Sequence, residues 1–150
     1  MRVVIQRVSH ASVTIEGRVK SDIKEGFMIL LGIGEDDNQE DIDWLCKKIA
    51  SLRVFDDENG VMNKSITDVN GDILVVSQFT LMASTKKGNR PSYIKAAKPE
   101  ISIPLYEQFC KDLSLAIGKP VSTGEFGADM KVELLNNGPV TICMDTKNKE

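Results

Sequence analysis

The sequence predicts an α+β fold in which mostly antiparallel sheets curl into a barrel-like core with two main helices. Seven or eight short strand-like runs are separated by turn signals, and two segments with helical spacing lie far apart in the chain. No strand–helix–strand alternation with a glycine-rich phosphate loop occurs, which argues against a dinucleotide-binding fold. The 150 residues suit one domain, and no linker or internal repeat divides residues 1–150.

The first half of the chain is expected to contain strands and one helix. Alternating apolar residues predict strands at residues 3–8 and 12–15, and the apolar run 27–33 predicts a strand buried on both faces. Residues 38–52 change to helical spacing, with acidic residues early and lysines late, as the helix dipole favours. Asn38 is the expected N-cap of this helix.

The second half is expected to contain short strands around a second helix. The predicted elements are turns at residues 56–60 and 69–72, a strand at 73–81, a polar loop at 84–99, a helix at 101–117, and strands at 130–135 and 140–144. Gly118 and Pro120 end the second helix. The Asn-Asn-Gly-Pro sequence at 136–139 predicts a tight turn between the last two strands.

Composition excludes several classes of protein. A net charge of −3 disfavours extensive non-specific binding of nucleic acid. No apolar run approaches the ~20 residues that span a bilayer, and no basic and apolar leader opens the chain, so we expect a cytoplasmic protein without membrane contact. Three scattered cysteines and one histidine argue against a disulfide framework and the usual zinc sites. We expect no cofactor and no metal, although composition leaves a carboxylate-bound magnesium ion open.

Few side chains could act as nucleophile or base. The single histidine, His10, lies between two predicted strands and is expected to be a surface residue without a chemical role. Cys46 and Cys110 fall within the predicted helices, where a thiol is most often a small core residue. Nucleophile pairs that need an imidazole would therefore all depend on His10.

Polar side chains follow a run of four apolar residues at one strand end. Ser77, Gln78, Phe79 and Thr80 end the predicted strand, and a rigid sheet would fix the positions of their hydrogen-bonding groups. In a regular strand Gln78 and Thr80 would share one face and Ser77 the other, which disfavours a Ser77–Thr80 catalytic pair. The segment is interpreted as a candidate site, or as a core strand that runs out to a polar end.

Gly138 and Pro139 form the second unusual element. Proline cannot donate a ladder hydrogen bond, so one interpretation is a tight turn before an edge strand. The other interpretation is functional, because a Gly-Pro unit presents bare carbonyl oxygens. A cis peptide bond could point both oxygens the same way, but only ~5–6% of X–Pro bonds in folded proteins are cis.

Positive charge is concentrated in one stretch. Residues 83–99 contain five basic side chains and no acidic one: Lys86, Lys87, Arg90, Lys95 and Lys98. This stretch is either a solvated loop or a local phosphate-binding surface, in which Tyr93 is available for base stacking.

These segments together resemble the D-aminoacyl-tRNA deacylase family. Residues 77–81, Ser-Gln-Phe-Thr-Leu, match one signature of that family, and residues 137–141, Asn-Gly-Pro-Val-Thr, match the other. Further matching stretches are residues 2–8, 11–13, 30–33, 87–92 and 124–130. The similarity runs along nearly the whole chain in order, and neither signature contains a departure.

The resemblance implies a hydrolase that cleaves the ester between a D-amino acid and the 3′ acceptor end of tRNA. It also implies activity on mischarged glycyl-tRNA and a homodimer with its sites at the subunit interface. By analogy, Gly138 and Pro139 form a cis peptide that enters the partner subunit's pocket and rejects L-amino acids by steric clash. Arg7 is carried over as the residue that steadies this loop. Lys86, Lys87 and Arg90 are expected to meet tRNA phosphates.

Two mechanisms stay open on the sequence. Thr80 could attack the ester, although no base in its segment would activate a threonine hydroxyl. Alternatively, backbone N–H groups around Phe79 and Thr80 stabilise the oxyanion while the 2′-hydroxyl of the terminal adenosine helps to activate water. We favour the second because candidate bases are scarce. The rival function is a non-catalytic RNA-end or nucleotide-binding module in which Ser77 to Thr80 only bind a ligand.

Overall fold

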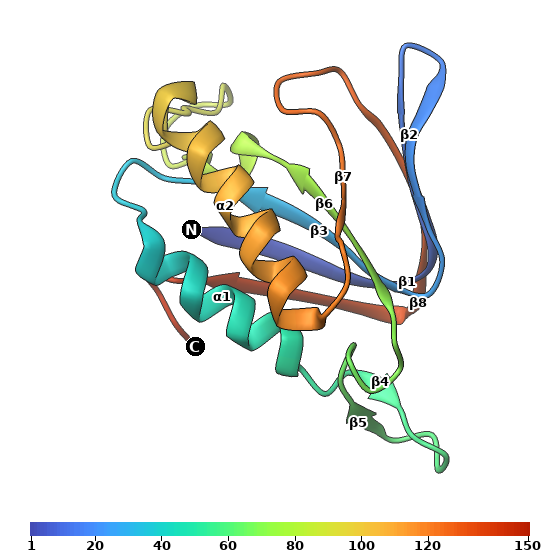
Figure 1. The fold of residues 1–150 in the computed structure, drawn as a ribbon. Helices are drawn as coiled ribbons and strands as arrows, with labels where there is room; N and C mark the ends of the chain where they lie inside the picture. Colours follow the sequence, from blue (N-terminus) through green and yellow to red (C-terminus); the bar gives the residue numbers. More distant parts are fainter.

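One six-stranded sheet is the centre of the fold, and the computed structural model describes all residues from Met1 to Glu150 (Figure 1). Its strands are β1 (Arg2–Ile15), β2 (Arg18–Ile23), β3 (Gly26–Gly32), β6 (Asp72–Ser77), β7 (Ser122–Thr123) and β8 (Lys131–Asp145). The remaining elements are α1 (Gln39–Ser51), the hairpin of β4 (Phe55–Asp56) and β5 (Met62–Lys64), the 3-10 turn η1 (Phe79–Met82) and α2 (Pro99–Ile117).

The sheet is mixed and nearly closes into a barrel, which confirms the predicted fold class with its two helices. β1 pairs antiparallel with β2, β3 and β8, whereas the pairs β3–β6 and β6–β7 are parallel. The parallel pairs are absent from the sequence prediction. They arise because α1 and α2 each lie in a crossover that returns the chain to the same end of the sheet.

The predicted break between two N-terminal strands does not exist. β1 is continuous from Arg2 to Ile15 because β8 pairs with it across the expected junction, for example at Val8↔Asn136 and Ala11↔Leu134. A partner strand on this edge satisfies the backbone groups that a turn would otherwise have to satisfy. His10 therefore lies within the strand, and it is exposed as expected.

The predicted turn at residues 136–139 is also wrong. β8 runs from Lys131 to Asp145 in one direction, and both of its halves pair with β1. The register passes from Gln6↔Thr141 to Val8↔Asn136, so four residues of β8 face the single residue Arg7. The Gly-Pro unit is accommodated as a wide bulge, because unpaired residues in a bulge need no ladder hydrogen bond.

The helices agree closely with the sequence prediction. Asn38 caps α1, accepting a hydrogen bond from the backbone N–H of Glu40, while Asp41 completes a capping box. α2 begins at Pro99, two residues earlier than predicted, because proline is well tolerated in the first turn of a helix. It ends at Gly118, which adopts a left-handed conformation with φ 75°.

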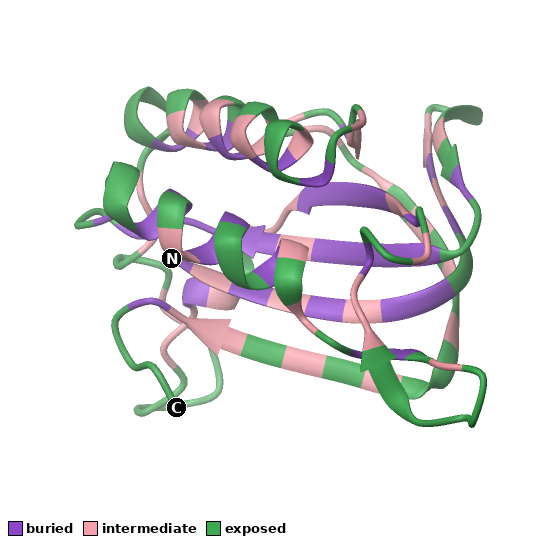
Figure 2. Cartoon of the chain, turned by 60° about the horizontal axis from the view of Figure 1, so that its bottom comes forward, coloured by how far each residue is buried: buried purple, intermediate pink, exposed green.

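Both helices pack on the same face of the sheet, where the main core lies (Figure 2). Twenty buried residues form this core; Phe27, Ile29, Leu45, Ile49 and Phe109 are among its fully buried members. A second cluster of seven buried residues fills the barrel on the other face. No helix has the length and hydrophobicity to cross a membrane. β3 and β6, which end next to η1, thus contribute residues to a buried cluster on each face of the sheet.

Candidate active site

The Ser77–Thr80 segment lies where β6 leaves the sheet. The predicted strand at 73–81 is too long: β6 ends at Ser77, and the chain turns into η1. It turns because its neighbour β3 ends at Gly32, and the last bond between them runs from the Gln78 N–H to the Leu31 carbonyl at 2.7 Å. The alternation of faces expected for a regular strand therefore does not apply beyond Ser77.

Glycine at position 32 lets the turn fold back onto β3. A Cβ atom built there would lie 2.9 Å from Cβ of Leu81, closer than side chains tolerate. The 3-10 hydrogen bonds begin with the N–H of Leu81, which donates to the Gln78 carbonyl at 3.2 Å. The N–H groups of Phe79 and Thr80 precede this first bond and have no acceptor within the turn.

A cavity of about 500 Å³ opens beside this turn. Ser77, Gln78 and Phe79 form part of its lining, whereas Thr80 lies outside it on the exposed side of the turn. Two further walls come from the segment 93–99, which follows Ser92, and from residues 126–130, which lead into β8. The rest of the lining comes from β3 and the residue after it, β6, α2 and β8: Leu31, Ile33, Val76, Ser102 and Val132. Most lining residues are apolar, so the cavity suits an apolar group and offers few polar contacts.

Phe79 and Tyr93 make an aromatic edge at this cavity. Their ring centroids are 5.1 Å apart in an edge-to-face arrangement, and both rings are exposed. Sequence reasoning singled out Tyr93 for stacking but assigned no role to the segments 93–99 and 126–130 as cavity walls. The only signal for the second wall was its match to the family pattern over residues 124–130.

The hydroxyl of Thr80 is already engaged by a neighbour. The side-chain amide of Gln78 donates a hydrogen bond to Oγ1 of Thr80. No imidazole or carboxylate accepts the hydroxyl proton. The single histidine, His10, pairs with Leu135 in the C-terminal half of β1. That half also pairs with β2 and lies away from Thr80. The arrangement supplies no general base for a threonine nucleophile.

The cysteines do not provide a nucleophile either. Burial raises the pKa of the Cys46 and Cys110 thiols to about 12, with smaller contributions from nearby charges. Both thiols are therefore protonated near neutral pH, and a protonated thiol is a poor nucleophile. Cys143 is exposed, but it lies on β8 and does not line the cavity.

Arg7 is hydrogen-bonded to the bulge that contains Gly138 and Pro139. It is only 8% exposed, donating from Nη1 to the Val54 carbonyl at 2.7 Å and from Nε to the Asn137 carbonyl at 2.9 Å. The Gly138–Pro139 peptide bond is cis, and both residues are exposed. Gly138 has φ 138°, and a Cβ atom there would lie 3.1 Å from Nη2 of Arg7, so glycine fits this position best.

The two signature segments lie at opposite ends of β3 within one protomer. Arg7, beside the bulge, pairs with Phe27, whereas Ser77 pairs with Leu31, four residues further along. This offset alone amounts to about 13 Å along the strand. The fold therefore does not bring Gly138 and Pro139 to the cavity of their own chain.

The basic side chains predicted to meet phosphate are exposed beside the cavity. Lys86, Lys87 and Arg90 lie in the loop that leaves η1, and none of them is paired with a carboxylate. Hydrogen bonds between Ser84 and Ser92 close this loop, and Tyr93 follows directly at the cavity. The positive charge and the cavity thus share one end of the molecule.

Comparison with known proteins identifies relatives over the full chain. Residues 4–145 match the family model described as D-Tyr-tRNA(Tyr) deacylase. The D-aminoacyl-tRNA deacylases of Bacteroides fragilis (strain YCH46) and Bacteroides thetaiotaomicron are 81% and 78% identical, over 100% of each chain. A solved structure titled c-Myc DNA Unwinding Element Binding Protein is 40% identical, with a TM-score of 0.93 over 97% of this chain and 99% of that chain. The protein is a member of the D-Tyr-tRNA(Tyr) deacylase family.

Proposed function

We propose that this protein hydrolyses the ester bond between a D-amino acid and the 3′ end of tRNA, releasing both. The observation that carries the proposal is the turn after Ser77, which leaves the N–H groups of Phe79 and Thr80 without a backbone acceptor next to an apolar cavity that Phe79 lines. The relatives named D-aminoacyl-tRNA deacylase support the choice of substrate. We place the reaction in the cytoplasm, where translation supplies aminoacyl-tRNA.

The catalytic groups are main-chain donors together with the substrate's own hydroxyl. The N–H groups of Phe79 and Thr80 stabilise the oxyanion that forms when water attacks the ester carbonyl, an interaction worth roughly 3–4 kcal/mol per donor in other hydrolases. The vicinal 2′-hydroxyl of the terminal adenosine helps to activate this water. Ser77 and Gln78 complete the site, and Gln78 fixes the Thr80 side chain. This scheme requires neither a histidine nor a metal.

Chirality is decided by a wedge of main chain. Gly138 and Pro139 project their backbone from the bulge that Arg7 holds, and the carbonyl oxygens meet the α-amino group of the substrate. The side chain of an L-amino acid would then point into the same main chain and clash. Glycine has no Cβ atom to clash, so mischarged glycyl-tRNA is also accepted.

The wedge acts on the cavity of a second copy of the chain. Gly138 and Ser77 lie at opposite ends of the sheet in one protomer, so a two-fold pair of copies would let each bulge reach the other cavity. A partly exposed apolar strip supports this homodimer: half-buried Val4 is paired with half-buried Leu30 and exposed Cys143 on the face opposite the helices. Phe79 in η1 and Leu135 in β8 are further exposed apolar side chains, at 57% and 53%.

The direct test is hydrolysis of matched substrates by the purified protein. D-Tyr-tRNA, L-Tyr-tRNA and Gly-tRNA are incubated with the enzyme, and the released amino acid is followed. We expect release of D-tyrosine and glycine, with L-Tyr-tRNA at the rate of the enzyme-free control. Tight binding of all three without turnover would instead identify a non-catalytic RNA-end-binding module, and equal hydrolysis of both tyrosine enantiomers would refute the wedge.

A further inference from the structure

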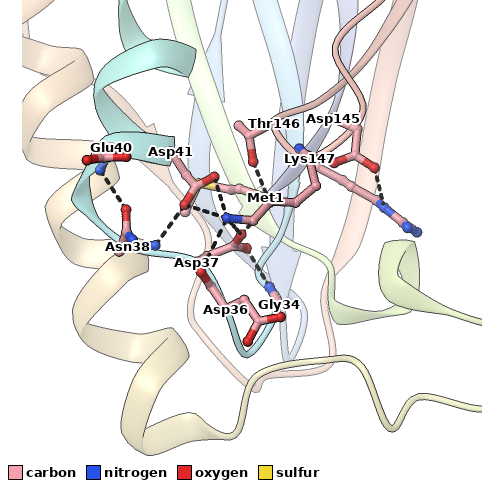
Figure 3. A network of polar contacts seen from close by, with 11 residues as sticks. Met1, Gly34, Asp36, Asp37, Asn38, Glu40, Asp41, Asp145, Thr146 and Lys147 are labelled. Atoms are coloured by element: carbon pink, nitrogen blue, oxygen red, sulfur yellow. Dashed lines mark hydrogen bonds and ion pairs between the residues drawn. The ribbon is translucent and has the colours of Figure 1, made fainter.

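One buried ion pair lies outside the proposed chemistry. The α-ammonium of Met1 donates to Oδ1 of Asp37 at 2.6 Å and to Oγ1 of Thr146 at 2.8 Å (Figure 3). The side chains of Met1 and Asp37 are 0% and 1% exposed. A charged carboxylate is stable in a protein interior only when a cation and further hydrogen bonds contact it. The positions of Met1 and Asp37 relative to each other are therefore narrowly constrained.

The second oxygen of Asp37 holds a turn after β3. Oδ2 accepts a hydrogen bond from the backbone N–H of Gly34 at 2.6 Å, and the N–H of Asp37 donates to the Gly34 carbonyl at 3.2 Å. Gly34 is tightly packed, since a Cβ atom there would lie 3.0 Å from Cε of Met82 in η1. Asp37 therefore links the Met1 ammonium directly to the Gly34 backbone, which packs against η1 at the candidate active site.

This turn carries one wall of the cavity. Gly34 forms an antiparallel bridge with Ala96, and the N–H of Ala97 donates to the Ile33 carbonyl at 2.9 Å. Ala96 and Ala97 line the cavity, and Tyr93 of the same segment packs against Phe79. Apart from these bonds, the segment 93–97 has only one backbone hydrogen bond, between Ala96 and Tyr93 within itself.

We propose that Asp37 is a positioning residue for the cavity wall at residues 93–97, and that it requires the free α-ammonium of Met1. Asp37 fixes the Ile33–Gly34 backbone, which in turn fixes Ala96 and Ala97 and, through them, Tyr93. The role in substrate binding rests on the proposed function. Asp37 touches no reacting atom and acts only through this wall.

The same network contains a matched control. Asp41 is also buried and shares Lys147 with Asp37, at 3.1 Å and 3.7 Å respectively. Its Oδ2, however, accepts from the backbone N–H of Asn38 at the start of α1, and it makes no contact with Gly34. Asp41→Asn therefore removes the same charge from the same network without touching the wall.

The test combines hydrogen exchange with steady-state kinetics on D-Tyr-tRNA. We expect Asp37→Asn to speed amide exchange at Ala97 by about tenfold and to raise KM by a similar factor, with kcat within about twofold of wild type. Asp41→Asn should lower the unfolding midpoint but leave Ala97 exchange and KM at wild-type values. Equal effects of both variants, or unchanged exchange in Asp37→Asn, would overturn the proposal.

A milder variant decides the matter if Asp37→Asn does not fold. Thr146→Val removes one acceptor of the Met1 ammonium while preserving side-chain shape and Asp37 itself, and we expect Ala97 exchange to rise about threefold. An exchange rate equal to wild type in folded Thr146→Val would refute the claim that the position of the Met1 ammonium controls the cavity wall. Exchange is measured without substrate, so a wild-type protein that hydrolyses nothing would refute the proposed function alone.

Discussion

In the proposed mechanism, the Thr80 side chain contributes little to catalysis. Its hydroxyl accepts a hydrogen bond from Gln78, lies outside the cavity lining, and has no base to receive its proton. The neighbouring backbone N–H groups need no activation, since they are held by the 3-10 turn. Groups fixed before the reaction stabilise charge without the cost of reorganisation, which favours the main chain over the side chain as the catalytic element.

Removing the Thr80 hydroxyl should therefore cost little. We expect Thr80→Ala to keep kcat/KM for D-Tyr-tRNA within about threefold of wild type, because both backbone donors remain, whereas loss of one donor costs ~10²–10³. A substrate that ends in 2′-deoxyadenosine should react at least ~10²-fold more slowly with the wild-type enzyme. Single-turnover hydrolysis measures both rates. An acyl group trapped on Thr80 would contradict this mechanism.

Arg7 shows which residue properties can be predicted from the sequence. It alternates in phase with Val3 and Ile5, both of them core residues, and it is buried with them. Periodicity alone could not reveal what compensates the buried charge. The carboxylate of Asp56 at 3.4 Å and the carbonyl groups of Val54 and Asn137 do so, and all three come from segments at least 47 residues away. Its role in steadying the bulge stays a prediction.

The basic loop is the element that connects the cavity to the nucleic acid in our proposal. It leaves η1, is closed by Ser84 and Ser92, and returns to the cavity at Tyr93. Its cations are exposed and free of carboxylate partners, so they remain available to phosphate groups. Because the rest of the chain carries an excess of acidic residues, this small patch should bind the acceptor end and little else of the tRNA.

Neutralising the loop should change the salt dependence of tRNA binding. We expect Lys86, Lys87 and Arg90 changed together to Ala to lower the slope of log Kd against log salt by about two, as the loss of three phosphate contacts implies. The matched control replaces Arg18, Lys20 and Lys24, exposed near β2 at the far end of the sheet. Filter binding from low to high salt measures the slope. Equal slopes for both triple variants would show that the loop makes no special contact.

β8 shows where local sequence signals mislead. Asn-Gly-Pro is a strong turn signal, yet the strand continues along β1 through a bulge because β1 offers pairing partners on both sides of it. The end of β6 shows the same effect in reverse. Its sequence is compatible with a longer strand, but β3 offers no partner beyond Gly32, and the chain turns. Helix α1 was predicted well because its cap and its apolar spacing are local features.

At the scale of the whole molecule, the candidate site is split between two ends of one sheet. The cavity lies at the end of β3 next to Ser77, and the bulge lies at the end next to Phe27. Neither a rotation of side chains nor a loop movement could join them across several strands. In the proposed homodimer, a second copy with its sheet reversed would bring the two ends together, so that dimerisation would be required for substrate selection.

This arrangement can be tested in a mixed dimer. One chain carries Gly138→Ala, whose methyl group would displace the bulge from Arg7 and Val140. The other carries Ala96→Trp, which fills the cavity with an indole ring. The Gly138→Ala homodimer should hydrolyse L-Tyr-tRNA, and the Ala96→Trp homodimer should be inactive.

The purified mixed dimer should regain selectivity, because its open cavity belongs to the first chain and its intact bulge to the second. We expect D-Tyr-tRNA to be hydrolysed and L-Tyr-tRNA to fall at least about tenfold below the Gly138→Ala homodimer. Differently tagged chains allow its isolation, and sedimentation gives its mass. Undiminished L-Tyr-tRNA hydrolysis would show that each bulge excludes L-amino acids from the cavity of its own chain.

The sequence by itself determined the fold class, both helices and the family, because these depend on periodicity, caps and motifs that are local in the chain. Only the tertiary structure decided that β8 continues through its glycine and proline, that the chain turns after Ser77, and that Asp37 meets Met1. Each of these features depends on a partner far away in sequence. The physical reason is that the backbone adopts whichever conformation satisfies its hydrogen bonds, and the available partners are set by the whole fold.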